Sequence, residues 1–120
     1  MANPVAVDEL IRVEEARFLA RMPRTAAMWQ RAQQVMPGGV SSSWASSRPV
    51  PVWVSHGEGG HVWDVDGNEY VDLHAGYGVN VVGHANPAVV RAVQERVTLG
   101  THFAQPTEDS IVVAENLAAR

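Results

Sequence analysis

The stretch WDVDGNEYVDL, residues 63–73, decides how this chain folds. Apolar and polar residues alternate on both sides of a break at Asp66, Gly67 and Asn68. Alternation is typical of a half-buried strand. Asp-Gly between two such runs is a strong hairpin signal, because glycine adopts positive φ without steric cost. The stretch therefore predicts two antiparallel strands joined at the break.

The acidic residues of this stretch also pose the question of a calcium site. An EF-hand loop takes ligands at its first, third and fifth positions, glycine at the sixth and glutamate at the twelfth. Counted from Asp64, the sixth position is Glu69 and the twelfth is Ala75. The spacing therefore excludes an EF-hand, and the hairpin interpretation stands.

Two further segments extend this hairpin into a small sheet. VPVWVSH (residues 50–56) and HVWDV (61–65) flank a Gly-Glu-Gly-Gly run at 57–60, which predicts a short hairpin loop. EYVDL (69–73) follows the Asp-Gly turn. Together these segments predict a three-stranded antiparallel meander.

Helices are predicted on both sides of the meander. Residues 5–36 place apolar side chains on one face, and Pro23 splits this helix so that a second piece covers 25–36. A polar, serine-rich loop follows it. Beyond the meander, Asn86-Pro87 opens a helix that Gly100 closes.

The last predicted helix starts at Thr107, a capping residue, with Glu108 and Asp109 in its positive first turn. Its apolar pattern continues to Arg120 with no residue that ends a helix. We therefore expect the sequence to be the N-terminal part of a longer protein.

Composition excludes several classes of function. The 120 residues are 46% hydrophobic and 18% charged with a net charge of -4, and no basic stripe predicts binding to nucleic acid. There is no cysteine for a disulfide or a thiolate. No apolar run approaches the roughly 18 residues of a membrane span, and the early acidic residues do not fit a signal peptide. A cytoplasmic protein is expected.

Histidines and glycines near the first hairpin suggest a metal or a phosphate, and both interpretations fail on spacing. His56 and His61 stand at the two ends of the predicted loop and could face each other, but no third ligand is tied to them. The glycines between them precede a strand instead of opening a helix, unlike a phosphate-binding loop. The sequence predicts no metal site.

Three loop positions remain as candidates for binding. The serines at 41–43 offer hydroxyl groups without a base in the motif, and the alternative is a flexible connection. Arg48 has the guanidinium that binds carboxylates bidentately, and the alternative is a solvated loop arginine. Tyr77, between two glycines, is either a ligand-facing ring or a partly buried core tyrosine.

Four segments in order resemble the N-terminal region of class-III pyridoxal-phosphate aminotransferases. They are PGGV (37–40), GHVWDVDGNEYVDL (60–73), GYGVNVVGHANP (76–87) and GTHFAQPTED (100–109), and the branch they resemble most is that of glutamate-1-semialdehyde aminomutase. The resemblance implies an α/β, fold-type-I enzyme that forms a homodimer. The portion present is α+β. Residues 1–36 form its N-terminal helical segment, 37–85 a loop and the meander of the small domain, and 86–120 helices leading towards the large cofactor domain.

The resemblance also implies pyridoxal phosphate as cofactor, bound as a Schiff base to a lysine. All nine basic residues of this chain are arginine. We therefore expect the lysine and most of the cofactor site to lie beyond Arg120, and the 120 residues alone to be inactive. Which residues of this chain touch the cofactor is unknown from the sequence.

Substrate residues carry over only at matching positions. The resemblance places Gly39, Val40 and Ser42 at the substrate entrance. The aminomutase branch continues with Ser-Pro-Val-Arg, where this chain has Ser42-Ser43-Trp44-Ala45, so the arginine for the substrate carboxylate is absent there and Arg48 replaces it if the loop is longer. Tyr77 matches a tryptophan near the substrate. The predicted substrate-binding residues are Ser42, Arg48 and Tyr77. His84 matches a recurrent Gly-His pair, with no proton-transfer role assigned.

The leading hypothesis is therefore an aminotransferase acting on an amino acid or amine and on an oxo acid or aldehyde. An aminomutase that moves the amino group within one molecule is the alternative. A hypothesis of another class is a non-catalytic interaction module whose apolar faces bind a partner chain. A downstream Ser-Gly-Thr loop and lysine would favour the enzymes, and a natural stop after Arg120 would favour the module.

Overall fold

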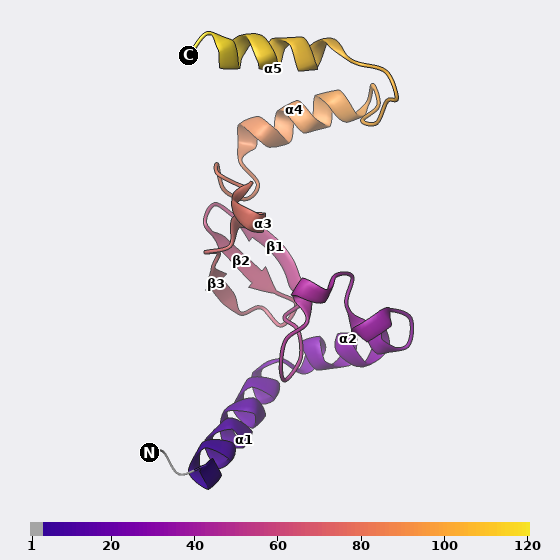
Figure 1. Cartoon of the computed structure of the whole chain (residues 1–120). Helices are drawn as coiled ribbons and strands as arrows, with labels where there is room; N and C mark the ends of the chain where they lie inside the picture. Colours follow the sequence, from indigo (N-terminus) through magenta and orange to yellow (C-terminus); the bar gives the residue numbers. More distant parts are fainter. Residues whose placement is uncertain (1–3) are drawn as a thin grey trace. The chain divides into compact units, whose positions relative to one another are not determined.

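The computed structural model describes residues 4–120, which fall into two compact units (Figure 1). The first unit ends at Ala85 and holds the N-terminal helices and the sheet. The second, Asn86–Arg120, holds two helices. Each unit is described by itself below.

The N-terminal helical segment is divided as Pro23 predicts. Helix α1 (Pro4–Arg21) ends before Met22, whose φ of -130° and ψ of 51° are not helical, and α2 (Pro23–Gln33) begins with Pro23 in its first turn. Proline fits there because the first N–H groups of a helix have no partner within the helix. α2 ends three residues before the predicted Met36, and a 3₁₀ turn, η1 (Pro37–Gly39), follows.

Gly39 explains why the chain turns sharply after α2. Its φ is 69°, and a Cβ there would overlap the ring of Trp29. Only glycine therefore lets the backbone pass so close to the face of that indole.

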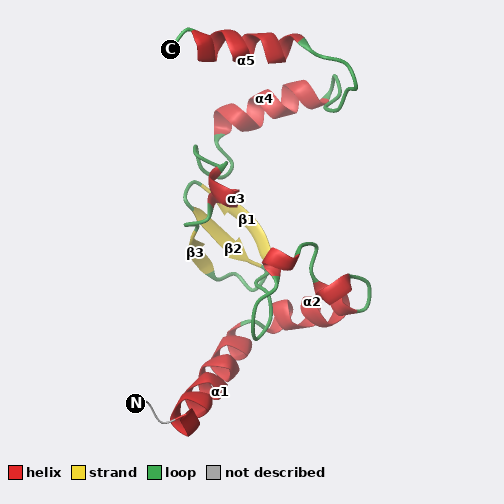
Figure 2. Cartoon of the chain, viewed as in Figure 1, coloured by secondary structure: helices red, strands yellow, loops and turns green. Residues whose placement is uncertain are grey.

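The predicted meander is confirmed. β1 (Val54–Glu58), β2 (His61–Asp64) and β3 (Glu69–Val71) form an antiparallel sheet in the order β1-β2-β3 (Figure 2). The Asp-Gly hairpin is confirmed as well, with Trp63 opposite Glu69 as the innermost pair and Gly67 at a φ of 89°.

The bounds predicted for the first strand are wrong. The sequence predicts strand 50–56 and a four-residue loop, whereas Gly57 and Glu58 lie in β1 opposite Val62 and His61. The turn is therefore only Gly59 and Gly60. Glycine is normally read as a turn signal, but at Gly57 the missing side chain leaves room for the ring of His84, as described below.

The core of the first unit is small and combines residues from both ends of α2, from the loop before β1 and from the end of β2. The fully or almost fully buried side chains there are Met22, Thr25, Ala32, Val50 and Asp64. Many large apolar side chains are instead exposed, among them Trp44 at 80%, Val81 at 85% and Leu73 at 93%. This unit therefore buries little apolar surface of its own.

The second unit contains α4 (Pro87–Val97) and α5 (Glu108–Ala118). The predicted Asn86 cap is confirmed, because its Oδ1 accepts from Ala88 N at 3.0 Å. The Thr107 side chain does not bind the backbone of α5 as predicted; its hydroxyl lies 3.4 Å from Asp109 Oδ2. The Thr107 hydroxyl thus donates to a carboxylate of the first turn and accepts no N–H group of α5.

Across residues 4–120 no helix has both the length and the apolar character needed to cross a membrane.

Candidate functional site

The Asp64 carboxylate organises the turn between β2 and β3. It is 1% exposed, and its Oδ1 accepts from the backbone N–H groups of Asp66 and Asn68 at 2.9 and 2.8 Å. Its Oδ2 accepts from Asn68 Nδ2 and from the Tyr70 hydroxyl, both at 2.8 Å. Burial alone raises the pKa of Asp64, but these hydrogen bonds outweigh it and the pKa lies below its ordinary value. A buried charge is thus fully paired by local donors.

Asp66 reaches from the same turn to the N-terminus of α2. Its Oδ1 accepts from Arg24 N at 2.7 Å and its Oδ2 from Thr25 N at 2.9 Å. Burial raises the pKa of Asp66. The hydrogen bonds from Thr25 and Arg24 lower it by more than burial raises it, so the pKa lies below its ordinary value. Asp66 therefore caps a helix from a distant segment, in place of Met22, which has no side-chain oxygen.

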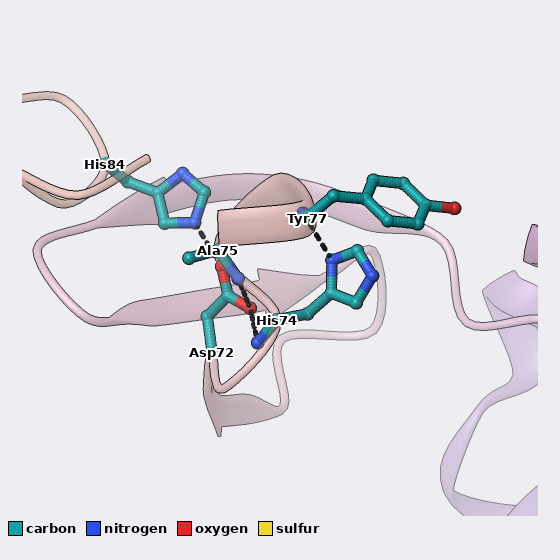
Figure 3. A network of polar contacts seen from close by, with 5 residues as sticks. All are labelled: Asp72, His74, Ala75, Tyr77 and His84. Carbon is teal, nitrogen blue, oxygen red and sulfur yellow. Dashed lines mark hydrogen bonds and ion pairs between the residues drawn. The ribbon is translucent and has the colours of Figure 1, made fainter. Parts of the chain in front are cut away.

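A second carboxylate network lies at the other end of the sheet, around Asp72 (Figure 3). Its Oδ1 accepts from the backbone N–H groups of His74 and Ala75, each at 2.9 Å. Its Oδ2 lies 2.7 Å from His84 Nε2. The His84 hydrogen bond, followed by those of Ala75 and His74, lowers the pKa of Asp72 to about 2.

The Asp72 network leads directly to Tyr77. Within the short left-handed turn α3 (Ala75–Gly78), Tyr77 N donates to His74 Nδ1 at 3.1 Å. The rings of His74 and Tyr77 meet edge to face at 4.3 Å. Figure 3 shows the Tyr77 ring pointing away from the Asp72–His84 pair.

His84 is anchored by its backbone as well as its ring. Its N–H donates to Gly59 O at 2.8 Å and its carbonyl accepts from Gly59 N at 2.9 Å. The neighbours of Asn80 orient its amide so that Nδ2 donates to Gly83 O, which places Oδ1 3.0 Å from His84 Nδ1. Both imidazole nitrogens therefore have a polar partner.

These side chains border a pocket of about 350 Å³. Its walls come from the β1–β2 turn, from Asp72 and from the segment that ends at His84. The lining residues are Gly59, Gly60, Asp72, Ala75, Asn80, Val81, Val82, Gly83 and His84.

The structure brings two of the three segments predicted to bind substrate together. Ser42 is exposed and precedes the 3₁₀ turn η2 (Ser43–Ala45), in which the ring of Trp44 meets the ring of Tyr77 edge to face at 6.0 Å. Tyr77 is 66% exposed, so the prediction of a ring free to face a ligand fits better than a core tyrosine. The roles of Ser42 and Tyr77 stay predictions.

Arg48 does not join the segments of Ser42 and Tyr77. It is exposed, it precedes the cis bond to Pro49, and within residues 4–120 no ion pair involves it. Its role as a carboxylate clamp therefore stays a prediction.

His56 and His61 do not face each other. The register pairs His56 with Trp63, and their rings stack at 4.9 Å, whereas His61 lies opposite Glu58. The shifted strand bounds explain this pairing. In the part of the chain that the structure describes, no cluster of three or more His, Cys, Asp or Glu side chains is arranged to hold a metal ion.

Sequence reasoning missed the roles of Asp72 and Trp44. Asp72 reads as a polar position of an alternating strand, and its partner His84 is twelve residues away. The one available signal for this pairing was the recurrent Gly83-His84 pair, to which the sequence analysis assigned no role. Trp44 lies two residues after Ser42, a predicted binding residue, and no partner was predicted for it.

Comparison with protein families identifies what this arrangement belongs to. The model for aminotransferase class-III matches residues 42–119, well over half of the sequence. The chain belongs to the class-III aminotransferase family. The resemblance inferred from the four motifs is therefore confirmed.

Relatives within this family are named for aminomutase activity. Glutamate-1-semialdehyde 2,1-aminomutase from Bordetella avium is 41% identical over 102 residues, which cover 82% of this chain and 24% of that enzyme. The chain thus spans about a quarter of the length of the curated relatives it matches.

Solved structures of class-III enzymes share the fold of this chain. A glutamate-1-semialdehyde aminomutase from Pseudomonas aeruginosa gives a TM-score of 0.84 at 32% identity, over 98% of this chain and 26% of that one. A lysine-to-alanine variant of it was solved in complex with PMP. An omega-transaminase from Sphaerobacter thermophilus gives 0.74 at 36% identity, over 80% of this chain and 22% of that one. The predicted class, helices and a small antiparallel sheet of a fold-type-I transaminase, is confirmed.

Proposed function

We propose that this class-III chain is the N-terminal part of a pyridoxal-phosphate-dependent aminotransferase. The enzyme acts on an amino acid or amine and on an oxo acid or aldehyde. The family match over residues 42–119 carries the proposal. The similarity to an omega-transaminase, with 36% identity, supports intermolecular transfer.

The residues present do not by themselves make a site for the cofactor. Pyridoxal-phosphate enzymes hold the cofactor on a lysine amine, and this sequence contains arginine but no lysine. No catalytic step is therefore assigned to these 120 residues. Their contribution in the proposal is to line the substrate site with Ser42 and Tyr77, with Arg48 as the predicted clamp for a substrate carboxylate.

An aminomutase is the second candidate, because the curated relative of 41% identity carries that name. One sequence difference separates the two. At the position where the resemblance to the aminomutase branch places an arginine for the carboxylate, this chain has Ala45. Without an arginine at this position, the charge-assisted hydrogen bonds to the carboxylate of glutamate-1-semialdehyde have to come from Arg48 in a longer loop, which disfavours the aminomutase geometry. The non-catalytic module has no support among these comparisons.

The experiment uses the full-length gene product, purified with pyridoxal phosphate. One assay supplies a panel of amine and amino-acid donors with an oxo-acid acceptor, and a second supplies glutamate-1-semialdehyde alone. Transfer in the first assay supports the aminotransferase. Turnover in the second assay only would establish the aminomutase, and turnover in neither would overturn both.

A homodimer and a cytoplasmic location belong to the same proposal. The family resemblance supports the dimer. Exposed apolar side chains such as Leu73, at 93%, are consistent with surface that further protein covers. Sedimentation of the full-length protein tests the dimer, and cell fractionation tests the location.

A further inference from the structure

The turn that carries Tyr77 is held in an unfavourable backbone conformation. Ala75, Gly76 and Tyr77 have φ values of 46°, 59° and 67°, all in the left-handed region. Glycine adopts this region freely, but alanine and tyrosine do so only when their surroundings compensate for the strain. The contacts of the turn must therefore be strong enough to fix it.

Asp72 supplies that compensation at the start of the turn. One carboxylate oxygen accepts both the His74 and the Ala75 backbone N–H groups at 2.9 Å, and a charged acceptor strengthens each of these bonds. His74 continues the chain of contacts, because its Nδ1 accepts from Tyr77 N at 3.1 Å. The position of Tyr77 thus depends on Asp72 through its own backbone.

His84 in turn fixes the Asp72 side chain, and two glycines make room for it. A Cβ on Gly57 would lie 2.6 Å from the His84 ring, and a Cβ on Gly83 would lie 2.8 Å from Gly59 O. Both glycines thus allow the segment with His84 to dock against β1. The docked imidazole holds Asp72 Oδ2 at 2.7 Å (Figure 3).

The ring at the end of this chain of contacts faces outward. Tyr77 is 66% exposed and touches Trp44, which belongs to the segment of Ser42. We propose that Asp72 and His84 are positioning residues that fix the left-handed turn and thereby hold Tyr77 against the substrate. This inference rests on the proposed function, because it assumes that Tyr77 faces a substrate.

The first test is a double-mutant cycle in the full-length enzyme with pyridoxal phosphate bound. In the enzyme that retains Tyr77, Asp72→Ala is expected to lower kcat/KM for the amino donor about 10-fold, mainly by raising KM. In a Tyr77→Ala background the same change is expected to cost less than about 2-fold, since residues that act through one another are not additive. Asp72→Asn retains an acceptor oxygen and is expected to recover part of the loss.

The matched control is Glu69→Gln on the same sheet. Glu69 also faces a histidine, His61, at 3.9 Å, whereas the side-chain hydrogen bonds described for the turn of Tyr77 come from Asp72 and His74. The Glu69→Gln variant is expected to leave KM for the amino donor unchanged. Equal losses from Asp72→Ala with and without Tyr77 would overturn the proposal, and Asp72→Asn carries the cycle if Asp72→Ala does not fold.

The second readout does not require activity. With 3-fluorotyrosine placed at position 77, the ¹⁹F resonance is expected to shift or broaden in Asp72→Asn and in His84→Gln, and to stay unchanged in Glu69→Gln. An unchanged resonance in both network variants would overturn the positioning role. Failure of the enzyme to transfer amino groups would instead overturn the proposed function and leave the ¹⁹F result to decide the positioning.

Discussion

At the scale of single residues, the carboxylates of this small sheet are each committed to several donors. Asp64, Asp66 and Asp72 together accept the N–H groups that open one helix and shape two turns. A carboxylate is suited to this because it has two oxygens, each able to accept more than one hydrogen bond. Removal of one such side chain strands several donors at once.

We expect Asp64→Ala to destabilise the full-length protein by roughly 2–4 kcal/mol, because it leaves several part-buried N–H groups and the Tyr70 hydroxyl without an acceptor. Thermal or urea unfolding measures this. The matched control is Asp8→Ala on the exposed side of α1, where a surface substitution is expected to stay within about 0.5 kcal/mol. Equal stability of both variants would contradict the role of Asp64.

Tyr70 is expected to ionise late. Burial and then its hydrogen bond to Asp64 raise the pKa of Tyr70 from 10.0 to about 12. A raised pKa contributes stability that is complete below pH 10.0 and is lost as pH rises towards about 12. An alkaline titration of tyrosinate absorbance, compared with Tyr70→Phe, measures it. A difference spectrum that titrates near pH 10.0 would contradict the Asp64 contact.

The predicted clamp is also tested at this scale. If Arg48 binds the substrate carboxylate, Arg48→Ala is expected to lower kcat/KM about 10- to 100-fold, which corresponds to about 1.4–2.8 kcal/mol, with cofactor absorbance intact. Arg31→Ala, at an exposed position of α2, is the control. Steady-state kinetics in which the two variants match would return Arg48 to the solvated surface.

At the scale of elements, two glycines set how β1 and the His84 segment meet. Gly83 has a φ of 79° and its Cβ would meet the backbone of Gly59, which cannot move aside as a flexible side chain does. We expect Gly83→Ala to destabilise the full-length protein by roughly 1–3 kcal/mol. Gly60→Ala is the control, since nothing lies within 4 Å of its Cβ. Thermal shift compares them, and equal melting temperatures would contradict this account.

Elements followed from the sequence where local chemistry decides them. Pro23, Asn86 and the Asp-Gly turn act through their immediate neighbours, and the helix break, the cap and the hairpin were all predicted. Gly57 shows where local reasoning fails. A side chain at position 57 would collide with the ring of His84, and His84 lies 27 residues further along the sequence. The contacts of the candidate site escaped prediction for the same reason. Tyr77 is predicted as a substrate residue from a motif, but the residues that support it and its contact with Trp44 depend on tertiary structure.

At the scale of the whole molecule, the balance of buried and exposed apolar surface predicts the behaviour of the isolated chain. Trp44, Leu73 and Val81 are at least 80% exposed, and both α4 and α5 leave large apolar residues uncovered. We expect the 120 residues expressed alone to associate or to unfold without cooperativity. Size-exclusion chromatography with a urea titration tests this. A compact monomer with a sharp transition would contradict it.

The cap that Asp66 gives to α2 has a consequence for the order of folding. The two N–H groups it accepts lie 42 and 41 residues away in sequence, and its carboxylate is placed only when the turn between β2 and β3 has formed. Non-local contacts of this kind form late, because the intervening loop must first be closed. While the chain is being synthesised, α2 emerges well before its cap and starts with its first N–H groups open to water. The N-terminus of α2 is therefore capped only after the hairpin of β2 and β3 has emerged from the ribosome.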